Sequence, residues 1–303
     1  MLYPDFDELM LLKSSTSKLS ILSNRLMKSL ISGNYFSSFH GHGLEFAEAR
    51  QYVPGDDIRK MDWRITARTG IPHIKLFTEE RERSVLMIID MNKTMRFGTR
   101  GTFKSIQAAR CAALIGWCAN KNMNKVGSLL FGDVKNGIEF LPPARSKRSL
   151  YQMFKRLCEK SDDSYFIPLD QVVEFANNIV SSSTVVFIIS DLMNIDENLN
   201  QQLGYLRSRC QVGLFSVNDP SDISIKQAGD ILFTSEEIKR LYVNTNSVTG
   251  NKLYEKQWHD RLLKLNQISF NLGIPHISLF TNQDIYTDLL YGLHTLSNGR
   301  KRR

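Results

Sequence analysis

From residue 84 onward, long apolar stretches alternate with helical patterns, and this alternation restricts the fold more than any other feature. The stretches Ser84–Asp90, Thr184–Ser190 and Cys210–Val217 are mostly apolar. Such runs are typical of strands that are buried on both faces of a parallel sheet. Because helical periods separate them, as over Thr102–Asn120, the sequence predicts a doubly wound, three-layer α/β domain over residues 84–303.

Smaller elements complete this pattern. Further strands are expected at Val126–Phe131, Gly137–Leu141, Ile231–Phe233, Leu241–Val243 and His276–Phe280. Further helices are expected at Lys147–Lys160, Leu169–Ser181, Glu197–Ser208, Asn251–Leu272 and Asp284–Leu293. Since Gly137–Leu141 follows its neighbour closely enough to form a hairpin or an edge, the sheet should be mostly rather than wholly parallel.

The first 83 residues do not follow the alternation, and we expect them to form an N-terminal region that packs on the α/β core. Leucine and methionine recur every three or four residues over residues 5–30, which predicts one or two amphipathic helices. Residues 33–83 are rich in glycine, aromatic and charged residues and have no helical period. Within them, Pro54–Asp57 indicates a turn and Ile71–Phe77 a strand.

Composition sets the background for function. Hydrophobic residues make up 42% of the chain and charged residues 23%, as is ordinary for a soluble globular protein. No apolar run is long enough to cross a bilayer, and the acidic start does not look like a signal peptide, so a cytoplasmic location is expected. The net charge of +8 leaves nucleic-acid binding as a weaker alternative, although no nucleic-acid-binding motif is recognisable. The four cysteines form no C-x-x-C pair and are expected to be free thiols, mostly buried.

Two predicted strands end in an aspartate, Asp90 in "MIID" and Asp191 in "FIISD". In open α/β sheets, ligands bind at the carboxyl ends of strands where the strand order reverses, and the first and fourth core strands can meet there. Asn92 and Thr94 alternate with Asp90, so all four side chains could face one crevice. Their oxygen atoms are ligands that magnesium accepts. The alternative is that both aspartates only begin loops or cap helices.

Other catalytic patterns are weaker. The stretch "GTRGTFKS" over Gly98–Ser105 approaches the spacing of a phosphate-binding loop, but Phe103 stands where glycine is needed. We therefore expect no nucleotide site, and Lys104 should lie on the exposed side of a helix start. No G-x-S-x-G elbow is present, although a histidine distant in sequence, such as His276, could still meet a serine in space. A metal-dependent hydrolase using Asp90 and Asp191 is the enzymatic alternative.

The stretch "GHGLEFAEARQYVPGDDIRKMDWRITAR" resembles the signature of the family called domain of unknown function 58, E-F-x-x-x-R-x-Y-x-x-G-D-D-x-R-x-x-D-W-x-x-x-A-R. The matching residues are Glu45, Phe46, Arg50, Tyr52, Gly55, Asp56, Asp57, Arg59, Asp62, Trp63, Ala67 and Arg68. The later stretches "FTEERERSVLMIIDMNKTM" and "SDL" are also similar to the family pattern. The resemblance implies a von Willebrand factor A-like fold. It also implies a non-enzymatic bacterial or archaeal protein that acts as partner or adaptor of a MoxR-type AAA+ ATPase.

A von Willebrand factor A-like fold implies a metal-ion-dependent adhesion site, with the pattern D-x-S-x-S, a threonine on a later loop and an aspartate after the fourth strand. Asp90, Asn92 and Thr94 fall on the D-x-S-x-S pattern, and Asp191 falls on the last aspartate. Ile167 stands at about the place of the threonine. The resemblance therefore implies a degenerate site whose affinity for magnesium is weakened or lost.

Three aspartates of the signature alternate with three arginines, which predicts an ion-pair network that fixes this segment. They are Asp56, Asp57 and Asp62, with Arg59, Arg64 and Arg68. Trp63 is expected to anchor the network with its large apolar area. A docking surface for the partner is the alternative. A second basic group, Arg145, Lys147 and Arg148, lies near a helix start and is expected to be exposed.

Overall fold

The computed structural model describes residues 3–14, 44–79, 84–160, 165–226, 228–233 and 241–299. The chain forms two compact units, residues 34–82 and residues 1–33 with 83–303, called here the signature unit and the α/β unit. A helix over residues 6–14 lies in the α/β unit, where Leu9 is buried and its carbonyl accepts a hydrogen bond from the Trp117 ring. The sequence predicts one region over residues 1–83, whereas this division separates residues 34–82 from the rest.

The α/β unit is built on a six-stranded sheet with the order β10-β7-β6-β3-β4-β5. Only β5 runs antiparallel, against β4. The strands are β3 (Ser84–Met91), β4 (Lys125–Gly132), β5 (Ile138–Ala144), β6 (Thr184–Ser190), β7 (Gln211–Asn218) and β10 (His276–Phe280). The prediction of a doubly wound, mostly parallel sheet is therefore confirmed.

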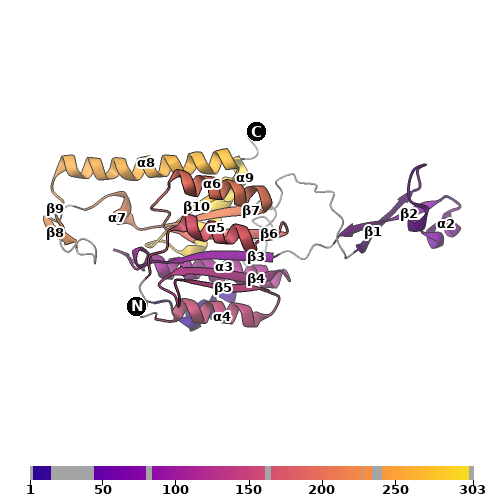
Figure 1. The fold of residues 1–303 in the computed structure, drawn as a ribbon, viewed down its shortest axis with the longest axis horizontal. Coiled ribbons are helices and arrows are strands. Elements are labelled where there is room, and N and C mark those ends of the chain that lie inside the picture. The colour runs from indigo at the N-terminus through magenta and orange to yellow at the C-terminus, as the bar shows by residue number, and fades with distance from the viewer. Residues whose placement is uncertain are drawn as a thin grey trace. The chain divides into compact units, whose positions relative to one another are not determined.

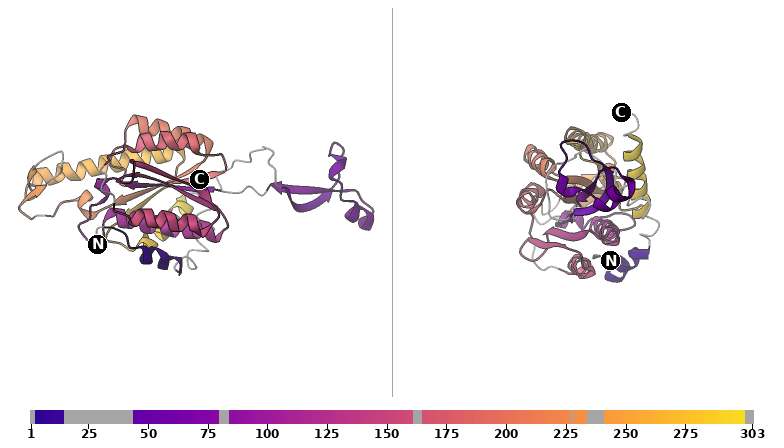
Figure 2. Two further views of the ribbon diagram at one scale, coloured as in Figure 1. Left: turned by 60° about the horizontal axis from the view of Figure 1, so that its bottom comes forward. Right: turned by 90° about the vertical axis from the view of Figure 1, so that its right-hand side faces the viewer.

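Helices cover both faces of this sheet (Figures 1 and 2). One face packs against the helix over residues 6–14 and against α3 (Lys104–Lys121), α4 (Lys147–Cys158) and α9 (Ile285–Gly299). The other face packs against α5 (Leu169–Ile179), α6 (Glu197–Arg209) and α8 (Val248–Leu272). Because successive strand residues point to opposite faces, the continuous apolar runs feed both cores at once.

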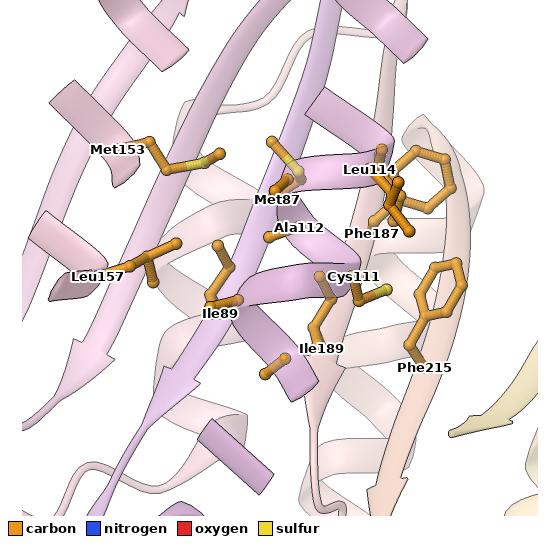
Figure 3. Close-up of a cluster of buried hydrophobic side chains, with 14 of the residues drawn as sticks. Met87, Ile89, Cys111, Ala112, Leu114, Met153, Leu157, Phe187, Ile189 and Phe215 are labelled. Atoms are coloured by element: carbon orange, nitrogen blue, oxygen red, sulfur yellow. The ribbon is translucent and has the colours of Figure 1, made fainter. Parts of the chain in front are cut away.

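Figure 3 shows the first of these cores, in which α3 lies directly on β3 and β6. Small residues such as Ala112 allow this close approach, and a side chain at Gly116 would meet Leu150 of α4. Cys111, Cys118 and Cys210 are buried and form no disulfide within the described part of the chain, as predicted. Burial raises the pKa of the Cys111 thiol, so this group is unreactive.

Short elements extend from the carboxyl side of the sheet. They are α7 (Pro220–Ile223) and an antiparallel pair, β8 (Asp230–Phe233) and β9 (Leu241–Asn244). None of the helices in the described ranges is both long and apolar enough to span a membrane.

The signature unit contains β1 (Leu44–Gln51) and β2 (His73–Glu79), which pair antiparallel. Between them lie the 3-10 helix η1 (Ile58–Lys60) and the helix α2 (Trp63–Thr69). The sequence analysis predicted β2 from its apolar run but neither helix. Both are short, and no residue of α2 is buried, so they leave no apolar period in the sequence.

Candidate functional site

The candidate site lies at the carboxyl ends of β3 and β6. These two strands are hydrogen-bonded neighbours. They run in parallel, with Ile89 opposite Ile189, at the point where the strand order reverses. Asp90 is the next residue of β3 after Ile89, and Asp191 directly follows β6. Both side chains are buried. The structure thus brings together the two aspartates at the topological switch point, where α/β folds place ligand sites.

Both carboxylate oxygens of Asp90 accept hydrogen bonds from the chain itself. The backbone N–H of Asn92 donates to Oδ1 at 2.9 Å, and the Ser190 hydroxyl donates to Oδ2 at 2.6 Å. Burial raises the pKa of Asp90 to about 7, the charge of Asp191 adds to the rise, and the two hydrogen bonds oppose it. Asp90 therefore ties the loop after β3 to the end of β6.

The Asn92 side chain makes a two-point contact with the backbone of Ile167. Its Nδ2 donates to the Ile167 carbonyl at 3.1 Å, and its Oδ1 accepts from the Ile167 N–H at 3.0 Å. Gly132, at φ 101°, lies directly against Asn92, since a Cβ there would be 2.4 Å from the Asn92 nitrogen. Asn92 is thereby held in place, and its amide joins two loops that are 75 residues apart in sequence.

Thr94 lies in the 3-10 helix η2 (Lys93–Met95), and its side chain is exposed rather than buried with Asp90. Asp191 accepts a hydrogen bond from the Met193 N–H through Oδ1 at 3.2 Å, so it begins the loop after β6. Its Oδ2 is buried and accepts no hydrogen bond from the residues that the structure describes.

Lys104 is a buried cation of this site, which corrects the prediction that it would be exposed. Its side chain is 3% exposed, and its Nζ lies 2.7 Å from Asp222 Oδ2 and 4.0 Å from Asp191 Oδ2. A buried ammonium requires carboxylate partners, and the residue that provides the shorter contact lies 118 positions away in sequence. Burial raises the pKa of Asp191, and the charge of Lys104 is the largest of the effects that oppose the rise.

The four predicted ligands do not form a magnesium site as they stand. Both oxygens of Asp90 and the Oδ1 of Asn92 accept internal hydrogen bonds, and Thr94 is exposed on η2. The remaining oxygen, on Asp191, faces an ammonium. Within the described part of the chain, no three His, Cys, Asp or Glu side chains are grouped as metal ligands. A hydrolase built on Asp90 and Asp191 gains no support from this arrangement.

Asp219 and Asp222 form a neighbouring carboxylate cluster that was not predicted from the sequence. Asp219 follows β7 and caps α7 together with Asp222. Burial would raise the pKa of Asp219, but hydrogen bonds from Thr281, Thr99 and Ser221 outweigh it and hold that pKa well below its usual range. The sequence carried a signal for this cluster, because "VNDPSD" contains the end of a third strand, β7, which an aspartate follows directly.

A serine and a histidine do meet, in the sheet rather than at its edge. Ser216 Oγ lies 2.7 Å from His276 Nε2, on the neighbouring strands β7 and β10. Burial lowers the pKa of His276 to about 4, and the charge of Arg261 lowers it further. Since Ser216 is buried, this pair has no access to a substrate and is a structural contact.

The signature unit differs from the predicted ion-pair network. Arg50 forms a two-point ion pair with Asp56, at 2.9 and 2.7 Å. Asp57 and Asp62 instead cap η1 and α2, accepting backbone hydrogen bonds from Arg59 and from Arg64 and Ile65 respectively. Short polar side chains that precede a helix commonly take this role.

Trp63 was predicted to be an anchor, but it is 68% exposed. Arg59, Arg64 and Arg68 are also exposed and form no ion pair with a carboxylate that the structure describes. The other signature residues shape the backbone: Gly55 has φ 109°, and the Tyr52 N–H donates to the Pro72 carbonyl. Glu45 lies on β1. The second basic group, Arg145, Lys147 and Arg148, is exposed at the start of α4, as predicted.

Several known proteins are similar to this chain. An uncharacterized protein of Mycobacterium tuberculosis (strain ATCC 25618 / H37Rv), Rv1480, is 26% identical over 230 residues, covering 75% of this chain and 71% of that protein. A protein of Mycobacterium bovis, Mb1516, is similar to the same extent. Among solved structures, conserved hypothetical protein BatB from Bacteroides thetaiotaomicron matches with a TM-score of 0.45 and 11% identity, over 71% of this chain and 99% of that one. The VWA domain of SpRpn10 matches with a TM-score of 0.39 and 12% identity, over 69% and 94%.

The sequence signature and the family comparison agree. Residues 48–261 match the family described as "Protein of unknown function DUF58", and this range includes most of the signature and the sheet as far as β7. Because the match covers more than half of the chain, the chain belongs to the DUF58 family.

Proposed function

We propose that this protein is a non-enzymatic interaction module that acts as partner or adaptor of a MoxR-type AAA+ ATPase. The observation that carries the proposal is the exposed surface of α2, formed by Trp63, Arg64 and Arg68 and called here the Trp63 surface. The type of partner comes from the resemblance of the signature to its family.

The composition of the Trp63 surface favours recognition of a protein. Tryptophan and arginine are the residues most enriched among those that dominate binding energy at interfaces. Large apolar side chains are usually covered in a folded domain, yet Trp63 is two-thirds exposed. An exposed tryptophan between arginines is therefore more readily explained by a partner than by the stability of the unit itself.

The helix that presents these side chains is fixed at both ends. Asp62 accepts hydrogen bonds from the backbone of Arg64 and Ile65, and Gly70 closes the helix in the left-handed conformation with φ 74°. An interface residue that is held in position loses less conformational entropy on binding. This rigidity supports α2 as a preformed recognition element.

The charges define the partner surface. The acidic groups near α2 are engaged internally, Asp56 with Arg50 and Asp57 and Asp62 as helix caps. The arginines of α2 therefore favour a partner surface that offers carboxylates around an apolar recess for Trp63.

Affinity capture from the native host tests this proposal. We expect the tagged full chain to recover a MoxR-type ATPase, identified by mass spectrometry. Trp63→Ala, and separately Arg64→Glu with Arg68→Glu, should lower the recovery at least about tenfold, as expected for a dominant contact. The matched controls are Tyr205→Ala, a half-exposed aromatic of α6, and Lys252→Glu with Lys256→Glu, which repeats the i,i+4 charge reversal on α8. Failure to recover any MoxR-type ATPase, or equal recovery by all variants, would contradict the proposal.

A further inference from the structure

We infer that the carboxyl edge between β3 and β6 is joined and neutralised by the side chains of Asn92 and Lys104, so that it takes no divalent cation. This inference concerns the α/β unit and does not depend on the identity of the partner.

Asn92 links the loop after β3 to the backbone of Ile167. A cation bound by oxygens of two loops holds those loops together. Here Asn92 makes that connection directly, with one hydrogen bond donated to Ile167 and one accepted from it. The oxygen that would bind the cation is therefore the atom that holds the neighbouring loop. A cation could reach it only if the hydrogen bond from the Ile167 N–H were broken.

Asn92 is also held in a fixed position. A side chain that could rotate would exchange a hydrogen bond for a metal ligand easily. The backbone of Gly132 lies so close to Asn92 that an added Cβ would be 2.4 Å from its nitrogen and 2.8 Å from its Oδ1. Asn92 is itself 4% exposed. Asn92 is therefore held in a buried, closely packed position by its two hydrogen bonds to Ile167.

The charge of Lys104 also disfavours a cation at this edge. Lys104 places an ammonium 4.0 Å from Asp191 Oδ2, a buried oxygen that accepts no hydrogen bond from the residues that the structure describes. Magnesium lies about 2.1 Å from its oxygen ligands, so a cation on that oxygen would be within about 6 Å of the ammonium. The buried acids Asp191 and Asp222 already face two cations, Lys104 and Arg261. A divalent ion on Asp191 would be repelled by these two buried cations.

A metal titration of the full chain, freed of metal with EDTA, tests the inference. We expect the midpoint of thermal unfolding to move by less than about 1 °C at 10 mM Mg²⁺, Mn²⁺ or Ca²⁺. A site with a Kd of about 0.1 mM would raise it by about 4 °C. Isothermal titration with Mn²⁺ should show no saturable heat. Saturable binding by the wild type that Asp191→Asn abolishes would overturn the inference.

A variant tests the part assigned to Lys104. Lys104→Met keeps an unbranched side chain that is one atom shorter and removes the charge, whereas Lys121→Met makes the same change at an exposed position of the same helix. Without added metal, Lys104→Met should unfold at a lower temperature than Lys121→Met, because Asp191 and Asp222 lose their buried cation. Equal midpoints for the two variants would show that the ammonium does not neutralise the site.

Discussion

At the residue scale, Asn92 shows how one side chain changes the chemistry of a strand end. A hydroxyl at this position would offer a single oxygen. The amide offers a donor and an acceptor in one plane, and so it can bind both the N–H and the carbonyl of Ile167. The sequence identified Asn92 as a candidate ligand because it carries an oxygen. Its actual partner lies 75 positions away and could not be read from local spacing.

His276 gives a residue-scale prediction for the dependence of stability on pH. Its folded-state pKa of about 4 lies below the ordinary value of 6.5, because burial disfavours the charged imidazole. Between those values the unfolded chain binds a proton that the folded chain does not, so stability rises with pH across this window. The free energy of unfolding should thus fall by up to about 3 kcal/mol from pH 7 to pH 4 through this group.

Urea unfolding at several pH values measures this effect. In His276→Gln the dependence between pH 4 and pH 6.5 should be clearly weaker than in the wild type. His259→Gln, which changes an exposed histidine of α8, should leave it unaltered. If the two variants show the same dependence on pH, His276 does not have the depressed pKa.

At the element scale, the sequence predicted the strands and helices that are marked by a pattern of apolar residues. β6 was expected at Thr184–Ser190 and lies there, since all its residues are buried and a continuous apolar run lies between its two polar end residues. The adjacency of β3 and β6, and so of Asp90 and Asp191, followed from the rules for doubly wound sheets. Lys104 could not be placed in the same way, because nothing near it in sequence indicates that Asp222 meets it.

The helix α2 was missed for a different reason. It has seven residues and no buried face, so only its caps mark it, Asp62 at the start and Gly70 at the end. Such end signals are weak evidence without an apolar period between them. The same lack of a buried face leaves Trp63 exposed.

The cap of α2 gives an element-scale prediction. Asp62→Ala removes two backbone hydrogen bonds and should destabilise the signature unit by about 1 kcal/mol. In hydrogen exchange, the amides at the end of α2 should lose about fivefold in protection. Asp57→Ala, which removes a single hydrogen bond from η1, should have a smaller effect. A larger loss in Asp57→Ala would contradict the assigned caps.

At the scale of the whole molecule, the two units divide the work. The α/β unit has an extensive core on each face of its sheet and a carboxyl edge that its own side chains fill. The signature unit has one pair of strands and short capped helices, an architecture that is only marginally stable alone. Its exposed tryptophan and arginines are features of recognition rather than of a core. On the proposed function, we expect partner binding at the signature unit, with the α/β unit as the stable scaffold.

Hydrogen exchange of the full chain, alone and with a purified MoxR-type ATPase from the same host, tests this division most directly. We predict that the ATPase slows exchange over residues 57–71 and that added EDTA does not change the exchange of the carboxyl edge around Asp90 and Asp191. In Trp63→Ala the protection of residues 57–71 should be lost. Protection confined to the α/β unit, or present in Trp63→Ala to the same degree, would contradict the account.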